Sequence, residues 1–433
     1  MLVVKGLFHA IATLAFSSIY FNIRAMNRTI NLPRISEEKR ESLLWLLAAA
    51  TFIIFFQAYM IAPLIPNLAE IFKASEQFTG LLIPAYLLPY GISTLFFGLL
   101  ADHFLPTSII ILSLLAFTVL SLLTAIATNI DQLILWRFLT GMGSSGVIPI
   151  SVALTGRLYN FKERGRPLGL LFGAMAGGAA TGSTLGVLIV PLIGWRLLFI
   201  GLGVLAAFVL AMLALNISRL QLPKLASSGL TLKKVFRIYY HLLTQRRGLM
   251  TYFYVFCNGV FHSGVFTWLG LYFKVNYSLH EWQIGLALLG YGLPGFILGP
   301  LIGKAVDKKG RKILLPAGIL ISALSVGLLA THSPLWVTFV LVSSLSLGYD
   351  LSQPLLAGII TEVGKHQPGQ AIGLNVFTLF MGFGMGSLLF GALIPYGWSV
   401  ALLTFTVFQL ILAIISFRVF KNETNTIEQT IPT

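Results

Sequence analysis

The sequence predicts an all-α membrane protein with twelve transmembrane helices, arranged as two six-helix bundles related by a pseudo-twofold axis along the membrane normal. Three observations lead to this fold class. Hydrophobic residues make up 57% of the chain and charged residues only 10%, against about 25% charged in soluble domains. Twelve apolar runs are each close to the roughly 20 residues that a helix needs to cross a bilayer. Landmarks of the first half recur in the second half at a near-constant spacing.

The twelve runs are separated by short polar connections. We expect them at 43–66, 79–101, 107–128, 132–156, 165–190, 195–216, 249–275, 282–304, 313–331, 335–361, 369–393 and 396–419. The longest connection, 219–248, is basic and falls where the two repeats join, so we assign it as the linker between bundles 43–218 and 249–419. A short surface helix is expected inside this linker.

The repeat can be read at single residues. Asp102 and Asp307 lie 205 residues apart, and Gly165 and Gly369 lie 204 apart, each in a similar local sequence. A spacing that holds across separated landmarks indicates two copies of one unit. Because each copy has six spans, both copies enter the membrane from the same side, which predicts a parallel repeat.

The cations divide the connections into two sets. Alternate connections are rich in Lys and Arg, and the others carry Lys73, Arg196 and Lys274 beside several acids. Short cationic loops stay in the cytoplasm, so we expect both termini there, in a plasma membrane of the bacterial inner-membrane type. The 1–42 segment and the 420–433 tail would then be cytoplasmic, with an interfacial helix or an extra span as alternatives for 1–42.

The net charge of +15 is explained by this orientation. The cations form no basic face with interleaved aromatic residues, so no nucleic-acid partner is expected. Cys257 is the only cysteine, which excludes an intrachain disulfide and a cysteine-based metal cluster. A phosphate-binding Gly-x4-Gly-Lys loop, a zinc pattern and a Gly-x-Ser-x-Gly elbow are absent from the sequence. We therefore expect neither enzymatic activity nor a cofactor or metal.

Three stretches resemble signatures of the major facilitator superfamily. Gly299 to Lys312, with Asp307 and then Gly-Arg-Lys, resembles the loop between the second and third helix of each half. Leu135 to Gly143 resembles the signature of the fourth helix, and Gly194-Trp195-Arg196 resembles the start of the sixth. The resemblance covers the chain from about residue 43 onward, and the drug:proton antiporter-like group is the part of the family that it suggests. It implies two bundles that rock about a central substrate site, which is secondary transport by alternating access.

The same resemblance implies a cytoplasmic gate, in which a loop carboxylate bonds to cations and a neighbouring helix end. We assign to this gate Asp102, Asp307, Arg311, Lys312, Gly303 and Arg157. His103 follows Asp102 where the second copy has its basic pair, so Arg157 or Arg164 is the expected partner of Asp102. The alternative is that both loops form tight turns and set only the topology.

Asp350 is the strongest candidate for chemistry inside the membrane. It is the only acidic residue that we place well within a predicted span, and a lone carboxylate there must face water or a cation. Such a group could carry a proton or bind a cationic substrate. A structural carboxylate bonded to neighbouring hydroxyl or backbone groups is the alternative.

Five further polar residues complete the predicted cavity. They lie on the first, fourth, seventh and tenth runs, which line the cavity in the family: Gln57, Arg137, Asn258, His262 and Gln353. By the resemblance, Arg137 is the arginine of the fourth helix near the proton path; alternatively it snorkels outward. His262 follows Asn258 by one helical turn and could share a proton relay with Asp350, or could be a packed hydrogen-bonding residue.

Glycines recur every four residues on the fifth and eleventh runs. We assign helix packing to Gly169, Gly173, Gly177, Gly382 and Gly386, with a second stripe at Gly178, Gly182 and Gly186. Small residues let helix backbones touch, so we expect these stripes at the interface between the halves.

The sequence therefore predicts a monomeric, proton-coupled secondary transporter, of the exporter type, for small amphipathic molecules. The fifth run lacks the Gly-Pro pair that marks many exporters of the family, which weakens the export direction. A facilitator or importer of a small, anionic metabolite is the first alternative, and a non-transporting sensor or scaffold is the second.

Overall fold

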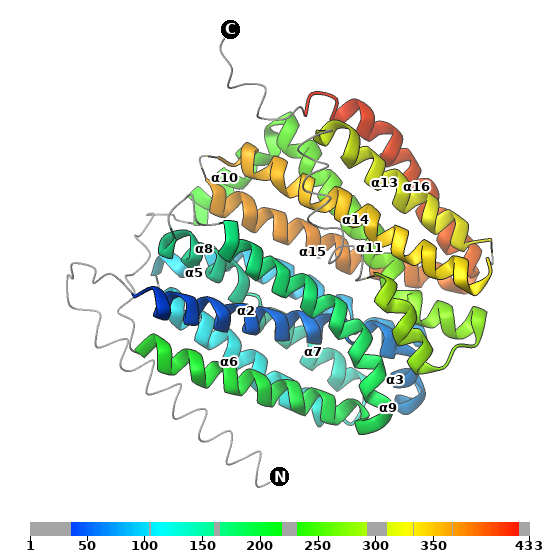
Figure 1. The fold of residues 1–433 in the computed structure, drawn as a ribbon, viewed down its shortest axis with the longest axis horizontal. Helices are drawn as coiled ribbons and strands as arrows, with labels where there is room; N and C mark the ends of the chain where they lie inside the picture. Colours follow the sequence, from blue (N-terminus) through cyan, green and yellow to red (C-terminus); the bar gives the residue numbers. More distant parts are fainter. Residues whose placement is uncertain are drawn as a thin grey trace.

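A computed structural model of the chain describes residues 36–103, 105–159, 165–218, 232–291, 310–331, 333–365 and 367–423. These residues are helical or lie in turns, and none of them is in a strand. The helices of the first half form the lower part of the view in Figure 1, and those of the second half form the upper part. Most of the predicted 1–42 extension, much of the eighth run and the end of the tail lie outside the described residues.

The described part of the first half contains nine helical elements. They are α2 (Glu37–Tyr59), η2 (Ala62–Leu64), α3 (Ile65–Phe72), α4 (Glu76–Gly80), α5 (Pro84–His103), α6 (Pro106–Ala125), α7 (Ile130–Ser144), α8 (Val147–Leu158) and α9 (Gly165–Ser218). The first helix begins six residues before the predicted run, with Glu37 and Glu38 in its first turn, where carboxylates stabilise the positive end of the helix dipole. Pro63 and Pro66 interrupt the helix after Tyr59, because proline has no backbone N–H to donate.

The second half follows helix α10 of the linker. The described elements of the linker and the second half are α10 (Leu232–Thr244), α11 (Arg246–Tyr277), α13 (Arg311–Leu329), α14 (Leu335–Val363), α15 (Pro368–Leu393), η4 (Ile394–Tyr396) and α16 (Trp398–Val419). Gly310, at the N-cap of α13, has a φ of 74°, a conformation that favours glycine. This glycine belongs to the basic loop signature, so its identity is explained by the backbone turn into α13.

Nine helical stretches of the described chain are long and apolar enough to cross a membrane. One of them lies within α9, which joins the predicted runs 165–190 and 195–216 across a kink at Gly194, where φ is 81°. Gly397, 203 residues later, has a φ of 113° just before α16. The chain is thus a multi-pass, all-helical membrane protein, and its twelve spans and twofold axis stay predictions.

Glycines of α9 bring its backbone against α2. A Cβ added at Gly178 would collide with the carbonyl oxygen of Phe52, and one at Gly182 would lie 2.8 Å from the Cα of Phe56. By contrast, a Cβ at Gly169 or at Gly173 would have no neighbour within 4 Å. The predicted packing role of those two glycines is therefore wrong, because their face of the helix is turned away from α2.

The second half repeats this joint between α15 and α11. A Cβ at Gly382 would collide with the carbonyl oxygen of Phe256, and one at Gly386 would lie 2.7 Å from the Cα of Val260. Each contact lies 204 residues after its counterpart in the first half. Both joints lie within a half, so the glycine stripes do not form the predicted interface between halves.

The halves meet along α5 and α15 instead. A Cβ at Gly91 would lie 2.9 Å from the Cβ of Phe380, whose ring stacks on Tyr90 at 4.5 Å between centroids. Toward one end of this interface, the ring of Trp268 fills the space above Gly80, and its Nε1 donates to the carbonyl oxygen of Ser387 at 3.0 Å. Aromatic side chains therefore occupy much of the contact between the two bundles.

Candidate functional site

Arg137 of α7 is completely buried, with no exposed side-chain surface. Its Nε donates to the carbonyl oxygen of Leu82 at 3.3 Å, and its two terminal nitrogens donate to those of Gln57 and Ala58, both at 3.2 Å. The guanidinium also lies 4.2 Å from the ring centroid of Tyr86. Arg137 therefore does not snorkel outward, and in the described chain no carboxylate bonds to it.

The carbonyl groups that hold Arg137 belong to two helix breaks. Gln57 and Ala58 lie in the last turn of α2, where carbonyls lose their helical donors. Leu82 lies in the turn between α4 and α5. A cation at the negative end of a helix dipole is stabilised by it. Arg137 therefore joins the interrupted first and second spans by bonding to the free carbonyls of both.

Asp350 lies at the centre of α14 and is half-buried. The hydroxyl of Ser346, one turn earlier, donates to its Oδ2 at 3.4 Å. Pro354 is inside the same helix and cannot donate to the backbone carbonyl of Asp350, four residues before it. Among the described residues, Asp350 has no ion-pair partner, so its carboxylate is held only by weak, neutral contacts.

His262 of α11 is buried, and its hydrogen-bond partners among the described residues do not include Asp350. Its Nδ1 lies 3.3 Å from the hydroxyl of Tyr291, and its Nε2 lies 3.1 Å from the hydroxyl of Ser322 on α13. The rings of His262 and Tyr349 lie 4.9 Å apart. No hydrogen bond joins His262 to Asp350 among the described residues, and the shared proton relay stays a prediction, with Tyr291 and Tyr349 as the tyrosines that contact His262.

The three remaining predicted cavity residues take part in two separate hydrogen bonds. Asn258 donates to the side-chain oxygen of Gln353 at 3.1 Å, which joins the seventh and tenth runs. Gln57 donates to Ser121 of α6 at 2.6 Å. The six residues therefore divide by half: Gln57 and Arg137 in the first, the other four in the second.

The end of the second half near α10 carries a network of ion pairs. Arg311, at the start of α13, pairs with Glu362 at the end of α14. Arg247 bonds to both Glu362 and Glu423, at 2.7 Å in each case. The backbone N–H of Lys312 donates to the carbonyl oxygen of Glu423 at 3.2 Å. The predicted gate residues Arg311 and Lys312 thus meet at helix ends, but with partners that the prediction did not include.

The predicted contacts of the other four gate residues lie outside the described part of the structure. Asp102 and Arg157 lie near the ends of α5 and α8, and their side chains are outside the described part of the structure. Gly303 and Asp307 also lie outside it. Glu362 lies 205 residues after Arg157, the same spacing that relates Asp102 to Asp307. The repeat could therefore have pointed to Glu362 as a gate residue.

The matching end of the first half has a smaller network of the same kind. Glu41 accepts two bonds of 2.8 Å from Arg166 and one of 3.1 Å from the hydroxyl of Tyr159. Burial, followed by the bond to Glu41, raises the pKa of Tyr159 to about 12, so this hydroxyl remains a donor at neutral pH. Helix ends of α2, α8 and α9 are thereby held together.

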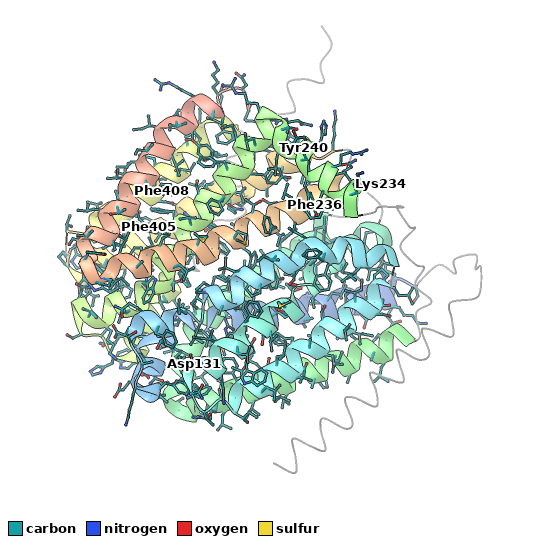
Figure 2. The ribbon with its side chains drawn as sticks, turned by 180° about the vertical axis from the view of Figure 1, so that it is seen from behind. Asp131, Lys234, Phe236, Tyr240, Phe405 and Phe408 are labelled. Carbon is teal, nitrogen blue, oxygen red and sulfur yellow. The ribbon has the colours of Figure 1, made fainter. Side chains whose placement is uncertain are left out.

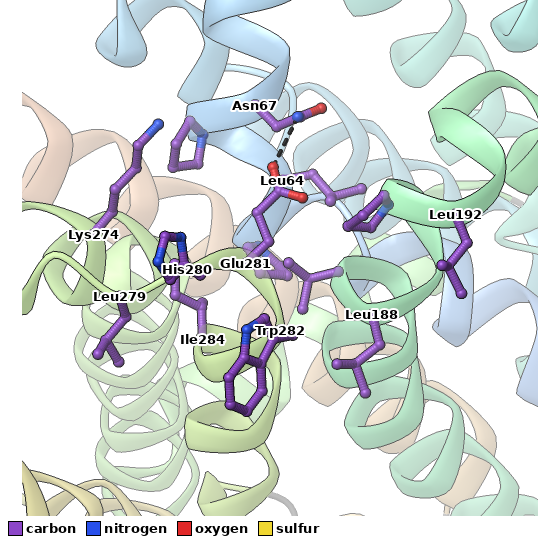
Figure 3. A pocket seen from close by; sticks show the side chains of 14 residues that line it. Leu64, Asn67, Leu188, Leu192, Lys274, Leu279, His280, Glu281, Trp282 and Ile284 are labelled. Atoms are coloured by element: carbon purple, nitrogen blue, oxygen red, sulfur yellow. Dashed lines mark hydrogen bonds between the residues drawn. The ribbon is translucent and has the colours of Figure 1, made fainter.

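A cavity of about 750 Å³ opens at the opposite end, between the two halves. Figure 3 shows its lining, in which Asn67 of α3 donates to Glu281 at 2.9 Å. Lys274 and His280 lie on one side of it, and Leu188 and Leu192 of α9 on the other. None of the six predicted cavity residues lines this space, so it is a vestibule between the ends of the halves and not the predicted central site.

Long apolar helices that bury a charged residue and hold a carboxylate at mid-span define a multi-pass membrane protein with ionisable groups inside the membrane, as is typical of transporters. The sequence model of the Major Facilitator Superfamily matches residues 47–283 and 274–433. The chain belongs to this superfamily, and secondary transport is the general function that membership supports.

The individual relatives have low sequence identity to this chain. The uncharacterized MFS-type transporter YceJ of Bacillus subtilis is 25% identical over 358 residues, covering 81% of this chain and 88% of that protein. The quinolone resistance protein NorA of Staphylococcus aureus is 24% identical over 350 residues, covering 79% and 87%. A crystal structure of a bacterial homolog of the human lysosomal transporter Spinster, inward-facing and occupied, gives a TM-score of 0.75 at 14% identity over 90% of this chain and 100% of that one. This last likeness concerns the fold alone.

Proposed function

We propose that this chain is a proton-coupled exporter of small amphipathic molecules that works by alternating access. The observation that carries the proposal is the environment of Asp350. Its carboxylate lies at mid-span with Ser346 as its hydrogen-bond donor and, within the described residues, no cation beside it. A charged carboxylate in such a place is costly, and the cost is relieved when it binds a proton or a cationic substrate.

The surroundings of Asp350 suit proton exchange. Tyr291 and Tyr349 lie within electrostatic reach of Asp350, and Tyr291 bonds to His262. Hydroxyl groups and imidazole both donate and accept hydrogen bonds, so they can pass a proton toward a carboxylate. In this proposal Asp350 is the coupling residue, and His262 positions Tyr291.

Alternating access connects the protonation of Asp350 to the movement of substrate. A proton on Asp350 favours one arrangement of the two halves, and the free carboxylate favours the other, because only the charged form needs water or a cation. In the same scheme the ion pairs of Arg311, Arg247 and Glu362 hold the cytoplasmic helix ends of the second half together, so that this half moves as one unit.

The substrate class follows from the aromatic residues between the halves. Phe55 and Tyr59 of α2 lie 6.0–6.5 Å from Phe380, Phe266 and Phe383 of the other half, measured between ring centroids. Rings of this kind accept the apolar part of an amphipathic molecule, and Asp350 would attract a cationic part. The name of the relative NorA, a quinolone resistance protein, agrees with export of such compounds.

Flux in proteoliposomes tests the coupling. For the unmodified protein we expect a pH gradient to accelerate transport of an amphipathic cation such as a fluorescent dye. Asp350→Asn should reduce gradient-driven flux by tenfold or more while substrate exchange without a gradient continues, since the amide keeps the shape but cannot release a proton. Asp131→Asn, at an exposed acid in the first turn of α7, is the matched control and should leave both rates unchanged.

The alternatives give different results in the same assay. Import or facilitated diffusion of an anionic metabolite would show flux that ignores both the pH gradient and Asp350→Asn. This alternative has less support, because the donors of Arg137 and the nitrogens of His262 are already bonded within the protein. A sensor or scaffold would show no flux at all, and its pathway would survive a bulky substitution at Gly177.

A further inference from the structure

Helix α10 has an exposed surface that the transport mechanism does not use. Val235, Tyr239 and Leu242 are buried, and the helix packs with this face on α11 and α15. Phe236 and Tyr240, labelled in Figure 2, remain 57% and 71% exposed. They are four residues apart and therefore lie on one face of the helix. Two large aromatic side chains on one short helix are thus left without cover.

Cations border this aromatic stripe. Lys233 precedes Phe236 by three residues, and Arg237 precedes Tyr240 by three, so each cation neighbours an aromatic ring on the helix surface. Both cations are exposed, and the thirteen residues of α10 include no acid. The exposed surface is therefore apolar along one line and positively charged along the next.

The position of α10 indicates that this surface lies at the edge of the membrane. Only Gln245 separates α10 from α11, and the side chains of Leu249 and Phe253, in the first turns of α11, are 44% and 48% exposed. We predict α11 to be the seventh span, and exposed apolar residues on a spanning helix face acyl chains. Because a helix rises about 1.5 Å per residue, the end of α10 lies within about one turn of that boundary.

We propose that Lys233, Phe236, Arg237, Tyr240 and Leu243 form a docking surface, the α10 lipid face, for anionic phospholipid headgroups. The rings enter the boundary between headgroups and acyl chains, as in interfacial amphipathic helices, while the two cations bond to the phosphates. The chemistry of the surface is complementary to an anionic membrane and not to a zwitterionic one. This inference depends on the membrane fold and not on the direction or coupling of transport.

The orientation predicted from the loop cations places this surface at the cytoplasmic leaflet of the membrane. α10 lies on the same side as the helix ends joined by Arg247 and Arg311, which we place in the cytoplasm. Since α10 also contacts α15, a helix that packs against the first half through α5, lipid bound at α10 lies next to an element that must move in alternating access. Anionic lipid would therefore stabilise the arrangement in which α10 is seated on α11 and α15.

Site-specific quenching tests the proposal in the full chain. The buried Cys257 is replaced by serine, and a polarity-sensitive fluorophore is attached to a single cysteine at Tyr240→Cys or, as the matched control on the polar face, at His241→Cys. The protein is placed in nanodiscs that contain doxyl-labelled phosphatidylglycerol or doxyl-labelled phosphatidylcholine at equal mole fraction. We expect strong quenching at position 240, weak quenching at 241, and more quenching by the anionic lipid.

Charge removal then tests the headgroup preference. At about 1 kcal/mol per cation near an anionic surface, each neutralisation should reduce the preference for phosphatidylglycerol about fivefold. Lys233→Gln with Arg237→Gln should therefore bring the quenching ratio of the two lipids close to one, while position 240 stays quenched. The unmodified protein supplies a measurement without variants: added phosphatidylglycerol should raise its melting temperature more than phosphatidylcholine does, and high salt should remove the difference.

Three results would overturn the proposal. Equal, weak quenching at 240 and 241 would show that the stripe faces water. Equal quenching by the two lipids in the unmodified surface would remove the anionic preference. Shielding of position 240 that appears only when cytosolic protein is added would assign the stripe to a protein partner.

Discussion

The two halves of this protein share a helix joint but differ in the charge that they carry inside the membrane. In each half a glycine pair, Gly178 with Gly182 and Gly382 with Gly386, presses one helix against the backbone of another. The first half then buries Arg137 on backbone carbonyls, whereas the second holds Asp350 with little support. An arginine keeps its charge at any physiological pH, but a carboxylate can lose it. One half therefore carries a fixed charge, and the other carries one that can be switched.

The largest expected effect is on the fixed charge. Arg137→Ala should lower the free energy of unfolding by about 3 kcal/mol or more, because three buried carbonyls lose their donor at about 1 kcal/mol or more each. Thermal unfolding in detergent would measure this loss. Arg196→Ala is the control, since Arg196 also donates to one carbonyl, that of Ala127, and stacks on Trp195, but is exposed.

We expect a change below about 1 kcal/mol for the Arg196 control. Equal loss in the two variants would mean that the three carbonyls accept water or backbone donors once Arg137 is gone. The three hydrogen bonds of Arg137 would then not be what fixes its charge in the first half.

The shared joint gives the next largest effect. Gly382→Ala and Gly178→Ala should each destabilise the protein by about 1–3 kcal/mol, because the new methyl group overlaps a backbone carbonyl. Gly173→Ala should be neutral or stabilising by up to about 1 kcal/mol, since alanine favours helix and a Cβ there has no neighbour. Melting temperatures of the three variants would decide this.

A difference in melting temperature between Gly178→Ala and Gly382→Ala would show how far the two halves share this joint. If only one of them is destabilising, then the halves do not share the joint in solution. Equal effects would support two copies of one packing unit.

The smallest effect is expected at the helix ends with ion pairs. Glu362→Gln removes a partner of both Arg247 and Arg311 and should cost about 1 kcal/mol, whereas Glu41→Gln should cost less, because its partner Arg166 is 65% exposed. Chemical denaturation at low and at high salt would measure both, and the difference should shrink in high salt. An unchanged Glu362→Gln protein would show that this network adds nothing measurable to stability.

Much of the membrane fold could be predicted from the sequence. Hydropathy placed most of the long helices that the structure describes, since a span must be long and apolar whatever it packs against, and the isolated Asp350 stood out for the same physical reason. The linker helix was expected close to where α10 lies. These features depend on local composition and on the solvent around the chain.

What could not be predicted depends on contacts between distant residues. Two glycine stripes occur on the fifth run, and only the rotation of that helix against α2 decides that Gly178 and Gly182 pack while Gly169 and Gly173 do not. The partners of His262 lie 29 and 60 residues away. The acceptors of Arg137 are backbone carbonyls freed by helix breaks. No pattern of side chains in the sequence predicts such acceptors.

The two reversals at Gly194 and Gly397 have a consequence for how the chain can be divided. Each glycine has a positive φ and turns the chain back between the last two helices of its own half, so neither half borrows a turn from the other. Each half also contains its own glycine joint. A gene cut within 219–231 and expressed as two separate polypeptides in one cell should therefore yield fragments that insert independently and reassociate into a complete protein.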